Sequence, residues 1–195
     1  MQFYLCGLQH QNISGGDKLM IEPIDMDMFE NIFNHIITLE GAYSNHRYDR
    51  GGETKFGITE ATAMRNGYRG AMYDLSLQKA REIYYQEYWL EPGFNKIKEY
   101  SIAKELFEQG VNLGPHEAVK NFQKSINYAC RNCLLVDGII GPRTLAAYKK
   151  CPNKNEIYVL LNVFQAQKYI SIVKNNPSQR AFLKGWLKRV NLTKE

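Results

Sequence analysis

The sequence predicts a mainly α-helical protein in which β structure is confined to one short region after Glu40. Apolar residues recur at the three- and four-residue spacing of a helix face along most of the 195 residues. The exception is the polar stretch 43–58, whose glycines and scarce apolar positions are typical of a loop or short strands. No repeat and no low-complexity linker interrupts the pattern, so we expect one α-rich globular unit.

The first helix is expected over residues 27–39, because Asp27 and Glu30 form a start that resembles a capping box. Proline marks several later boundaries: Pro92 stops one helix, and Pro115 and Pro142 suit the first turns of two others. The expected helices cover residues 27–39, 59–66, 76–90, a stretch marked by Ile102, Leu106 and Val111, then 115–132, 142–151, 155–174 and a last helix after Pro177.

The N-terminal stretch 1–24 is interpreted as an extension to the folded protein. The sequence leaves open whether Met1 or Met20 is the native start. Its first residues contain neither a basic segment nor an apolar core, so no secretory signal is expected and synthesis in the cytoplasm follows. No apolar run approaches the roughly 18 residues of a membrane span, so no stable membrane insertion is expected.

The charge is unevenly distributed. The whole chain has a formal net charge of +5. Residues 1–100 carry 10 Lys/Arg against 14 Asp/Glu, whereas residues 101–195 carry 15 against 6. A basic second half suits either an anionic partner or an ordinary solvated surface, and the sequence leaves both readings open.

The cysteines predict neither a metal site nor a disulfide framework. Cys130 and Cys133 have the spacing of a metal knuckle, but no second pair accompanies them and the four histidines are scattered. Both fall on a helical pattern, where cysteine often serves as a small buried apolar residue. We therefore expect no metal and no cofactor, and the lack of a disulfide pattern fits a reducing cytosol.

Glu40 is the leading candidate for catalysis. It follows Ile36 by four residues and Ile37 by three, so it continues the apolar stripe of the first expected helix. Burial raises the pKa of a carboxyl group, and a carboxylic acid that stays protonated near neutral pH can act as a general acid. The alternative is a solvated residue at a helix end.

Asp49 and Thr54 follow Glu40 in the polar stretch. A tight loop or hairpin would place all three around one cleft, where two carboxyl groups in unlike surroundings are the usual device of glycoside hydrolysis. Gly51 and Gly52 would let the backbone approach a sugar closely. By spacing alone the pattern is weak, since most carboxylate pairs are surface residues and Asp49 also suits a turn.

A resemblance strengthens this interpretation. The chain resembles glycoside hydrolase family 108, bacterial and phage N-acetylmuramidases, over about residues 25–190. The segments that carry the resemblance are 39–45 (LEGAYSN), 49–59 (DRGGETKFGIT), 83–89 (IYYQEYW), 107–114 (FEQGVNLG), 136–145 (VDGIIGPRTL) and 182–189 (FLKGWLKR).

The resemblance implies a lysozyme-like helical fold and cleavage of the β-1,4 bond between N-acetylmuramic acid and N-acetylglucosamine in peptidoglycan. It implies that Glu40 is the catalytic acid, with Asp49 as base or electrostatic stabiliser and Thr54 holding the water. Glu53 stands where the family has a small residue, so it competes with Asp49 for the second role. It further implies a catalytic region at 25–115 and a C-terminal peptidoglycan-binding region at 116–195, packed in the same unit.

Further residues are candidates for binding the glycan strand, each with an alternative in packing or capping. Tyr43, Tyr88 and Trp89 can offer aromatic faces to sugar rings, although aromatic residues on a helix often pack in a core. Asn112 can bind an acetamido group or cap a helix near Gly114. The Asp137–Gly138 pair is expected to form a turn, with peptidoglycan contact as the minority reading.

Two alternatives to a muramidase stay open at this stage: a lytic transglycosylase, which needs only one acidic residue, and a non-catalytic peptidoglycan-binding module. The spacing of Glu40 and Asp49 favours an inverting mechanism with a water molecule between the two carboxyl groups. Without a signal peptide, a phage holin or a bacterial secretion system would have to bring the enzyme to the periplasm. The sequence does not choose between phage lysis and a role in secretion or toxin export, and it indicates no nucleic-acid partner.

Overall fold

The computed structural model describes residues 23–40, 53–131 and 134–193, with the α1 side chains described from Met26 to Ile37. The elements, in chain order, are α1 (Pro23–Glu40), β1 (Thr54–Lys55), β2 (Ile58–Thr59), α2 (Glu60–Arg65), η1 (Met72–Asp74), α3 (Leu77–Ile83), η2 (Tyr84–Leu90), η3 (Phe94–Lys96), α4 (Tyr100–Leu113), α5 (Pro115–Cys130), α6 (Pro142–Lys150), α7 (Lys154–Asn175), η4 (Pro177–Gln179) and α8 (Arg180–Leu187). The predicted mainly α-helical, lysozyme-like class with a small β region is confirmed.

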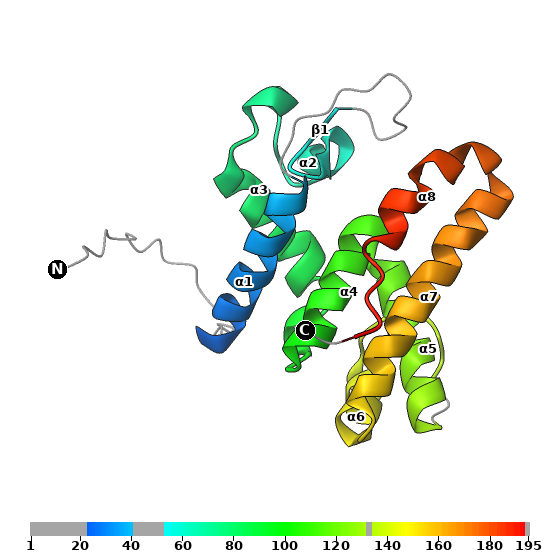
Figure 1. Cartoon of the computed structure of the whole chain (residues 1–195). Helices are drawn as coiled ribbons and strands as arrows, with labels where there is room; N and C mark the ends of the chain where they lie inside the picture. The colour runs from blue at the N-terminus through cyan, green and yellow to red at the C-terminus, as the bar shows by residue number, and fades with distance from the viewer. Residues whose placement is uncertain (1–22, 41–52, 132–133, 194–195) are drawn as a thin grey trace.

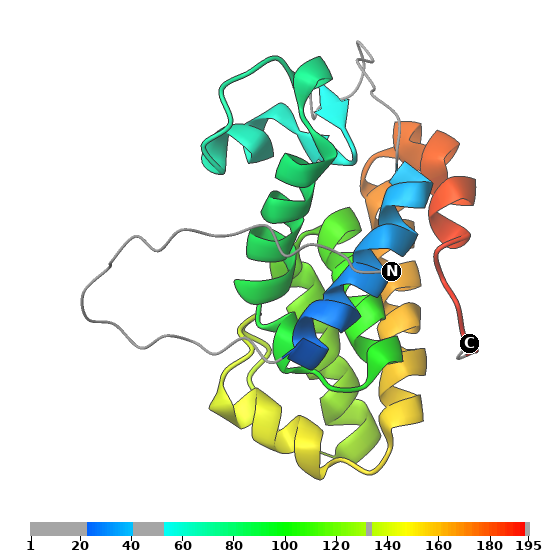
Figure 2. The ribbon, with the colours of Figure 1, turned by 90° about the vertical axis from the view of Figure 1, so that its left-hand side faces the viewer.

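Helix α4 is the centre of the arrangement. It packs against α1 on one side and against α5 and α7 on the other, and α5 and α7 also pack against each other (Figure 1). The hairpin, α2 and the first turns of α3 gather at one end of the molecule, next to the end of α1 (Figure 2). Helix α8 turns back along α7, so its C-terminal segment runs beside α4 (Figure 1).

The apolar stripe predicted for the first helix is confirmed. Phe29, Ile32, Phe33 and Ile36 are all buried, and they recur at the spacing of one helix face. The helix begins at Pro23 rather than at Asp27, because proline has a backbone angle suited to a first turn and no N–H that needs a partner there. It ends at Glu40, one residue beyond the expected end at Leu39.

A two-residue turn closes the β1–β2 hairpin. Thr54 pairs with Thr59 and Lys55 with Ile58, so Phe56 and Gly57 form the turn, with φ of 53° and 72°. Positive φ at both central residues defines a type I′ turn, which matches the twist of a hairpin but disfavours a phenylalanine. The hydroxyl of buried Tyr84 donates to the Phe56 carbonyl at 2.8 Å and helps to hold this conformation.

The helix predicted over residues 76–90 forms in two parts. Ser76 caps α3 by accepting from the Lys79 N–H at 3.1 Å, as expected. From Tyr84 the backbone continues as a π-helix to Leu90. A π turn holds more residues than an α turn, so it rotates the later side chains away from the face that a 3.6-residue period assigns to them.

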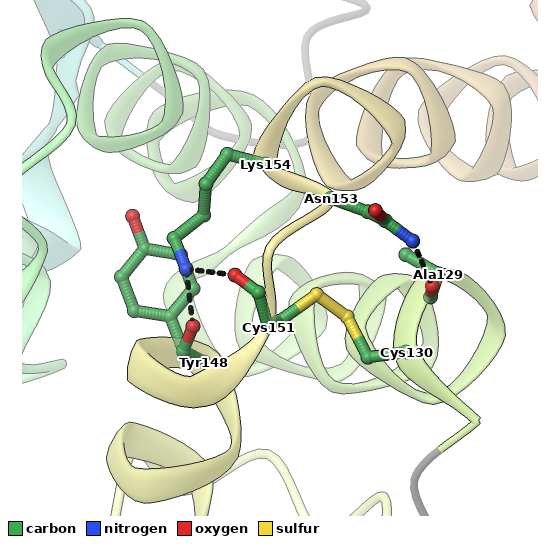
Figure 3. The surroundings of a disulfide bond; sticks show 6 residues. All are labelled: Ala129, Cys130, Tyr148, Cys151, Asn153 and Lys154. Atoms are coloured by element: carbon green, nitrogen blue, oxygen red, sulfur yellow. Dashed lines mark hydrogen bonds between the residues drawn. A yellow bond between two sulfur atoms is a disulfide. The ribbon is translucent and has the colours of Figure 1, made fainter.

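A disulfide between Cys130 and Cys151 joins the end of α5 to the residue after α6 (Figure 3). The two Cα atoms lie 5.6 Å apart although 21 residues separate them along the chain. The Asn153 amide donates to the Ala129 carbonyl at 2.8 Å and reinforces the junction. The sequence analysis predicted no disulfide framework and did not find this pair, because the packing of α5 against α6 brings the two cysteines together. Cys133 and Cys6 lie outside the described residues.

Replacing both Cys130 and Cys151 with Ser should lower the free energy of unfolding by about 3 kcal/mol, because the disulfide restricts a loop of this length in the unfolded chain. Urea unfolding followed by circular dichroism under oxidising conditions measures the change. A thiol reductant should bring the unmodified protein to the stability of the double variant and leave the variant unaffected. Equal stability of the oxidised protein and the double variant would contradict the prediction.

Candidate active site

The expected catalytic centre maps to the end of the molecule where α1 stops. Glu40 is the last residue of α1, and the hairpin with Thr54 follows it in the described part of the chain. Both views place the end of α1, the hairpin and α8 at the same end of the molecule (Figures 1 and 2). The backbone of Glu40 and the residue Thr54 therefore lie in the same region of the molecule, whereas Asp49 is not described.

Several predicted site residues lie outside the described residues. They are the side chain of Glu40 and the residues Tyr43, Asp49, Gly51 and Gly52. Their roles stay predictions.

Thr54 is half-buried at the start of β1. The neighbouring carbonyl of Glu53 accepts from the Glu60 N–H at 3.0 Å, which extends the hairpin ladder to the start of α2. Thr59 caps α2 by accepting from the Thr62 N–H at 3.3 Å. These hydrogen bonds hold the backbone on both sides of Thr54 against the start of α2. The half-buried side chain of Glu53 precedes Thr54 in the chain.

Tyr88 keeps part of its surface exposed and remains a candidate for contact with a sugar. Its ring lies against Tyr84, with centroids 5.3 Å apart, and its hydroxyl shares a hydrogen bond with the Thr62 side chain. Burial raises the pKa of this phenol, and the neighbouring Glu87 carboxylate raises it further. Tyr88 is therefore neutral and held in place at physiological pH.

Trp89 is corrected from a substrate contact to a core residue. It has no exposed surface, and its ring packs at 6.0 Å from Phe107 and 6.1 Å from Phe29, measured between centroids. The π-helix is the physical reason, because it changes which side chains of the aromatic segment turn inward. In this structure Trp89 offers no face to a sugar.

Asn112 lies near the end of α4 and lines a pocket of about 360 Å³. Its side-chain N–H donates to the Glu108 carbonyl one turn earlier at 2.8 Å, so Asn112 bonds to its own helix rather than capping it. The C-cap is Gly114, whose φ of +89° favours glycine. The pocket is lined by α1, α4, α7, α8 and the segment that follows α8.

Glu105 is a titratable residue of this pocket that our sequence analysis did not single out. Only 4% of its surface is exposed, and burial raises the pKa of its carboxyl group to about 7. The Gln109 side chain donates to Glu105 Oε1 at 2.8 Å, and this hydrogen bond lowers the pKa of the carboxyl group. The positive charge of Lys104 also lowers this pKa, whereas the negative charge of Glu108 raises it. The signal was available, because Glu105 follows Ile102 by three residues on the apolar face of its helix, as Glu40 follows Ile37.

The Asp137–Gly138 turn is structural, as expected. The Gln123 side chain donates to Asp137 Oδ1 at 2.7 Å and to the Ile139 carbonyl at 3.0 Å, and it accepts from the Gly138 N–H at 2.9 Å. Gly138 has a φ of +77°, and a Cβ there would clash with the His116 ring. A single buried amide thus holds this turn against α5.

Within the described ranges, no group of three or more His, Cys, Asp or Glu side chains is arranged to hold a metal ion. In the same part of the chain, no helix combines the length and the apolar character needed to cross a membrane.

Comparisons with known proteins relate the chain to two family models and to solved structures. Residues 33–114 match the family model of glycosyl hydrolase 108, and residues 117–191 match that of a predicted peptidoglycan domain. A search of curated proteins finds no match. The solved structures that match include SagA from Brucella abortus, with 28% identity and a TM-score of 0.71, over 85% of this chain and 90% of that one.

The fold, the site region and these matches define a peptidoglycan hydrolase of the glycoside hydrolase class. Residues 33–114, which include Glu40 and Thr54, match glycosyl hydrolase family 108, and a segment that matches a predicted peptidoglycan domain follows in the same chain. The junction of the two matched regions falls at the connection between α4 and α5.

Stability should decrease as the pH rises from about 4.5 to about 7, because folded Glu105 holds a proton in this window that the unfolded chain has released. Glu105→Gln removes this ionisation and can still accept from Gln109. The difference in free energy of unfolding between the variant and the unmodified protein should therefore shift by about 3 kcal/mol in favour of the variant between pH 4.5 and pH 8. Urea unfolding across this pH range measures the effect.

The matched control is Glu156→Gln, which removes an exposed carboxylate from α7 and should leave the pH dependence unchanged. A Glu105→Gln protein with the same pH dependence as the unmodified protein would show that Glu105 ionises normally.

Proposed function

We propose that this protein is an N-acetylmuramidase that cleaves the β-1,4 bond between N-acetylmuramic acid and N-acetylglucosamine. One observation carries the proposal. The segment that matches the hydrolase family begins inside α1, ends at the end of α4, and includes Glu40 where α1 stops and Thr54 on the hairpin that follows. The peptidoglycan domain packs directly against this segment through α5 and α7.

In the proposed mechanism Glu40 donates a proton to the oxygen of the glycosidic bond. Asp49 is proposed to be the ionised carboxylate, which activates a water molecule or stabilises the positive charge that develops on the sugar. Thr54 helps to hold the water, and Glu53 is the competing second carboxylate. We propose inversion of the anomeric carbon, which proton NMR of freshly released sugars tests directly.

The binding of the glycan strand is proposed to use Tyr43, Gly51 and Gly52 beside the catalytic acid. Tyr88 and Asn112 are the described candidates, since one keeps an exposed aromatic face and the other lines the pocket next to α1. Sugar rings commonly pack on such aromatic faces through the apolar surface that both present.

Glu40→Gln should reduce the release of reducing ends from purified sacculi by at least about 100-fold, because an amide cannot supply the proton. Mass spectrometry of the products from the unmodified enzyme should give reducing N-acetylmuramic acid ends. The anhydro form would instead identify a lytic transglycosylase, and binding to sacculi without any cleavage would identify a binding module.

Glu60→Gln serves as the matched control, since Glu60 is exposed at the start of α2, and it should keep full activity. Asp49→Asn and Glu53→Gln, compared in the same assay, decide which carboxylate acts as the base. Full activity of folded Glu40→Gln would refute the mechanism.

The enzyme is proposed to act on the cell wall after delivery from the cytoplasm, either by a phage holin during lysis or by secretion machinery during wall opening or toxin export. The Cys130–Cys151 disulfide supports action outside a reducing compartment, since disulfides persist mainly in oxidising ones.

Expression of the chain in the cytoplasm of a Gram-negative host should leave the cells intact, because the substrate lies beyond the inner membrane. Co-expression with a holin should cause lysis, measured as a fall in culture turbidity. The Glu40→Gln variant with the same holin is the control for damage by the holin alone. Lysis without any delivery partner would contradict this part of the proposal.

A further inference from the structure

An aromatic and basic face runs along α5 and α7. The two helices pack side by side (Figure 1), and both lie within the segment that matches the peptidoglycan domain, apart from the first residues of α5. Lys120, Lys124 and Tyr128 recur at four-residue spacing on α5, so they form one row along that helix. Phe164 and Lys168 have the same spacing on α7. We call these five residues the α5–α7 face.

Side-chain contacts join the two rows. The Tyr128 and Phe164 rings have their centroids 5.9 Å apart and are inclined at 43°. The Lys124 ammonium group lies 5.6 Å from the centroid of the Phe164 ring, within the range of a cation–π contact. Lys168 pairs with Glu117 of α5 at 3.1 Å. The α5–α7 face is therefore held together by contacts between the two helices.

The aromatic part of this face is open to solvent. Tyr128 exposes 73% of its surface, and Phe164 is half-buried. A single exposed apolar residue is ordinary on a protein surface. Here a second ring and a lysine lie beside the tyrosine, which combines an apolar ring with a polar tip and belongs to a residue type enriched at binding surfaces.

The charge of the face favours an anionic ligand. Lys120, Lys124 and Lys168 carry three positive charges against the negative charge of Glu117, which is already paired with Lys168. The sequence left open whether the basic second half of the chain serves an anionic partner or the solvent. The arrangement of these lysines along the exposed aromatic pair favours the partner.

We propose that the α5–α7 face is a second binding site for peptidoglycan, which holds the enzyme on the wall between cleavages. Tyr128 and Phe164 pack against the apolar faces of the amino sugars, and Lys120 and Lys124 bind the carboxylates of the stem peptides. The inference rests on the proposed function only for the choice of polymer, because the ring pair and the cations are features of the face itself.

The position of the face separates it from the proposed catalytic residues. Tyr128 lies two residues before Cys130, at the end of α5 that the disulfide joins to α6. Figures 1 and 2 show this end of α5 at the opposite end of the molecule from the β1–β2 hairpin. Polymer bound at the face therefore leaves the region of Glu40 and Thr54 accessible to another part of the wall.

Co-sedimentation of the full chain with purified sacculi tests the proposal, on ice so that little polymer is cleaved. Tyr128→Ala and Lys124→Ala should each weaken binding about tenfold, because each removes one of the two kinds of contact. Thermal melts check that both variants are folded, and Lys120→Ala replaces either one that is not. Unchanged binding by the folded variants would overturn the proposal.

Ile170→Ala and Lys174→Ala are the matched controls. Both residues are exposed on α7, at positions that do not continue the row of Phe164 and Lys168, so both variants should keep full binding.

Sacculi whose carboxylates have been converted to neutral amides separate the two kinds of contact. The unmodified protein should bind them more weakly than untreated sacculi, because the lysines have lost their anionic partner. Tyr128→Ala should lose further affinity on this substrate, whereas Lys124→Ala should lose much less. A Tyr128→Ala protein that binds both kinds of sacculi equally would overturn the proposal.

Cleavage assays distinguish this proposal from the proposed function. Both variants should cleave short soluble muramyl oligosaccharides at the normal rate and sacculi more slowly, whereas general damage to the fold would lower both rates. Binding that depends on Tyr128 and Lys124, in a protein that cleaves neither substrate, would refute the muramidase and support the face. Normal cleavage of sacculi by both variants would refute the face alone.

Vesicles that contain phosphatidylglycerol test an anionic membrane as the other occupant. Binding to these vesicles that depends on Tyr128 and Lys124, together with unchanged binding to sacculi, would overturn the proposal in favour of a membrane surface.

Discussion

The buried amide of Gln109 is the interaction on which the arrangement of the helices depends. Its Nε2 donates to Glu105 at 2.8 Å and to the Leu161 carbonyl of α7 at 3.0 Å, and its Oε1 accepts from Asn121 of α5 at 3.0 Å. Unpaired, each of these buried groups would cost about 1–3 kcal/mol, so α4, α5 and α7 have one favourable relative placement. Because α4 belongs to the segment that matches the hydrolase family and the other two helices to the segment that matches the peptidoglycan domain, the two regions share one hydrophobic core.

The sequence predicted well the features that local physics determines. The apolar stripe of α1 and the Ser76 cap depend on residues at most a few positions apart, and both are confirmed. Pro115 and Pro142 begin α5 and α6, as expected from a side chain that fits only a first turn. Glu40 falls at the end of α1 for the same local reason, since Gly41 follows the last residue of the stripe.

Features that depend on distant partners could not be predicted in this way. The Cys130–Cys151 pair spans 21 residues, and no spacing rule selects Cys151 over Cys133 before α5 and α6 are placed. Trp89 was assigned to the wrong surface because the α-helical period does not hold through η2. Glu105 had a local signal and a local partner, Gln109, one turn later on the same helix. Its other partner, Asn162, becomes a neighbour only when α4 packs on α7, and the burial that raises its pKa arises from that packing.

The Cys130–Cys151 disulfide makes the stability of the protein depend on whether its surroundings are oxidising or reducing. If the enzyme passes from a reducing to an oxidising compartment, non-covalent contacts such as the bond from Asn153 to Ala129 hold the junction of α5 and α6 in the reducing compartment. In the oxidising compartment the disulfide closes the junction covalently. The cytoplasmic pool would then be the form more readily cleared by host proteases, while the delivered pool would persist. A single oxidation step would thus act as a maturation event that favours enzyme already at the wall over enzyme still stored inside the cell.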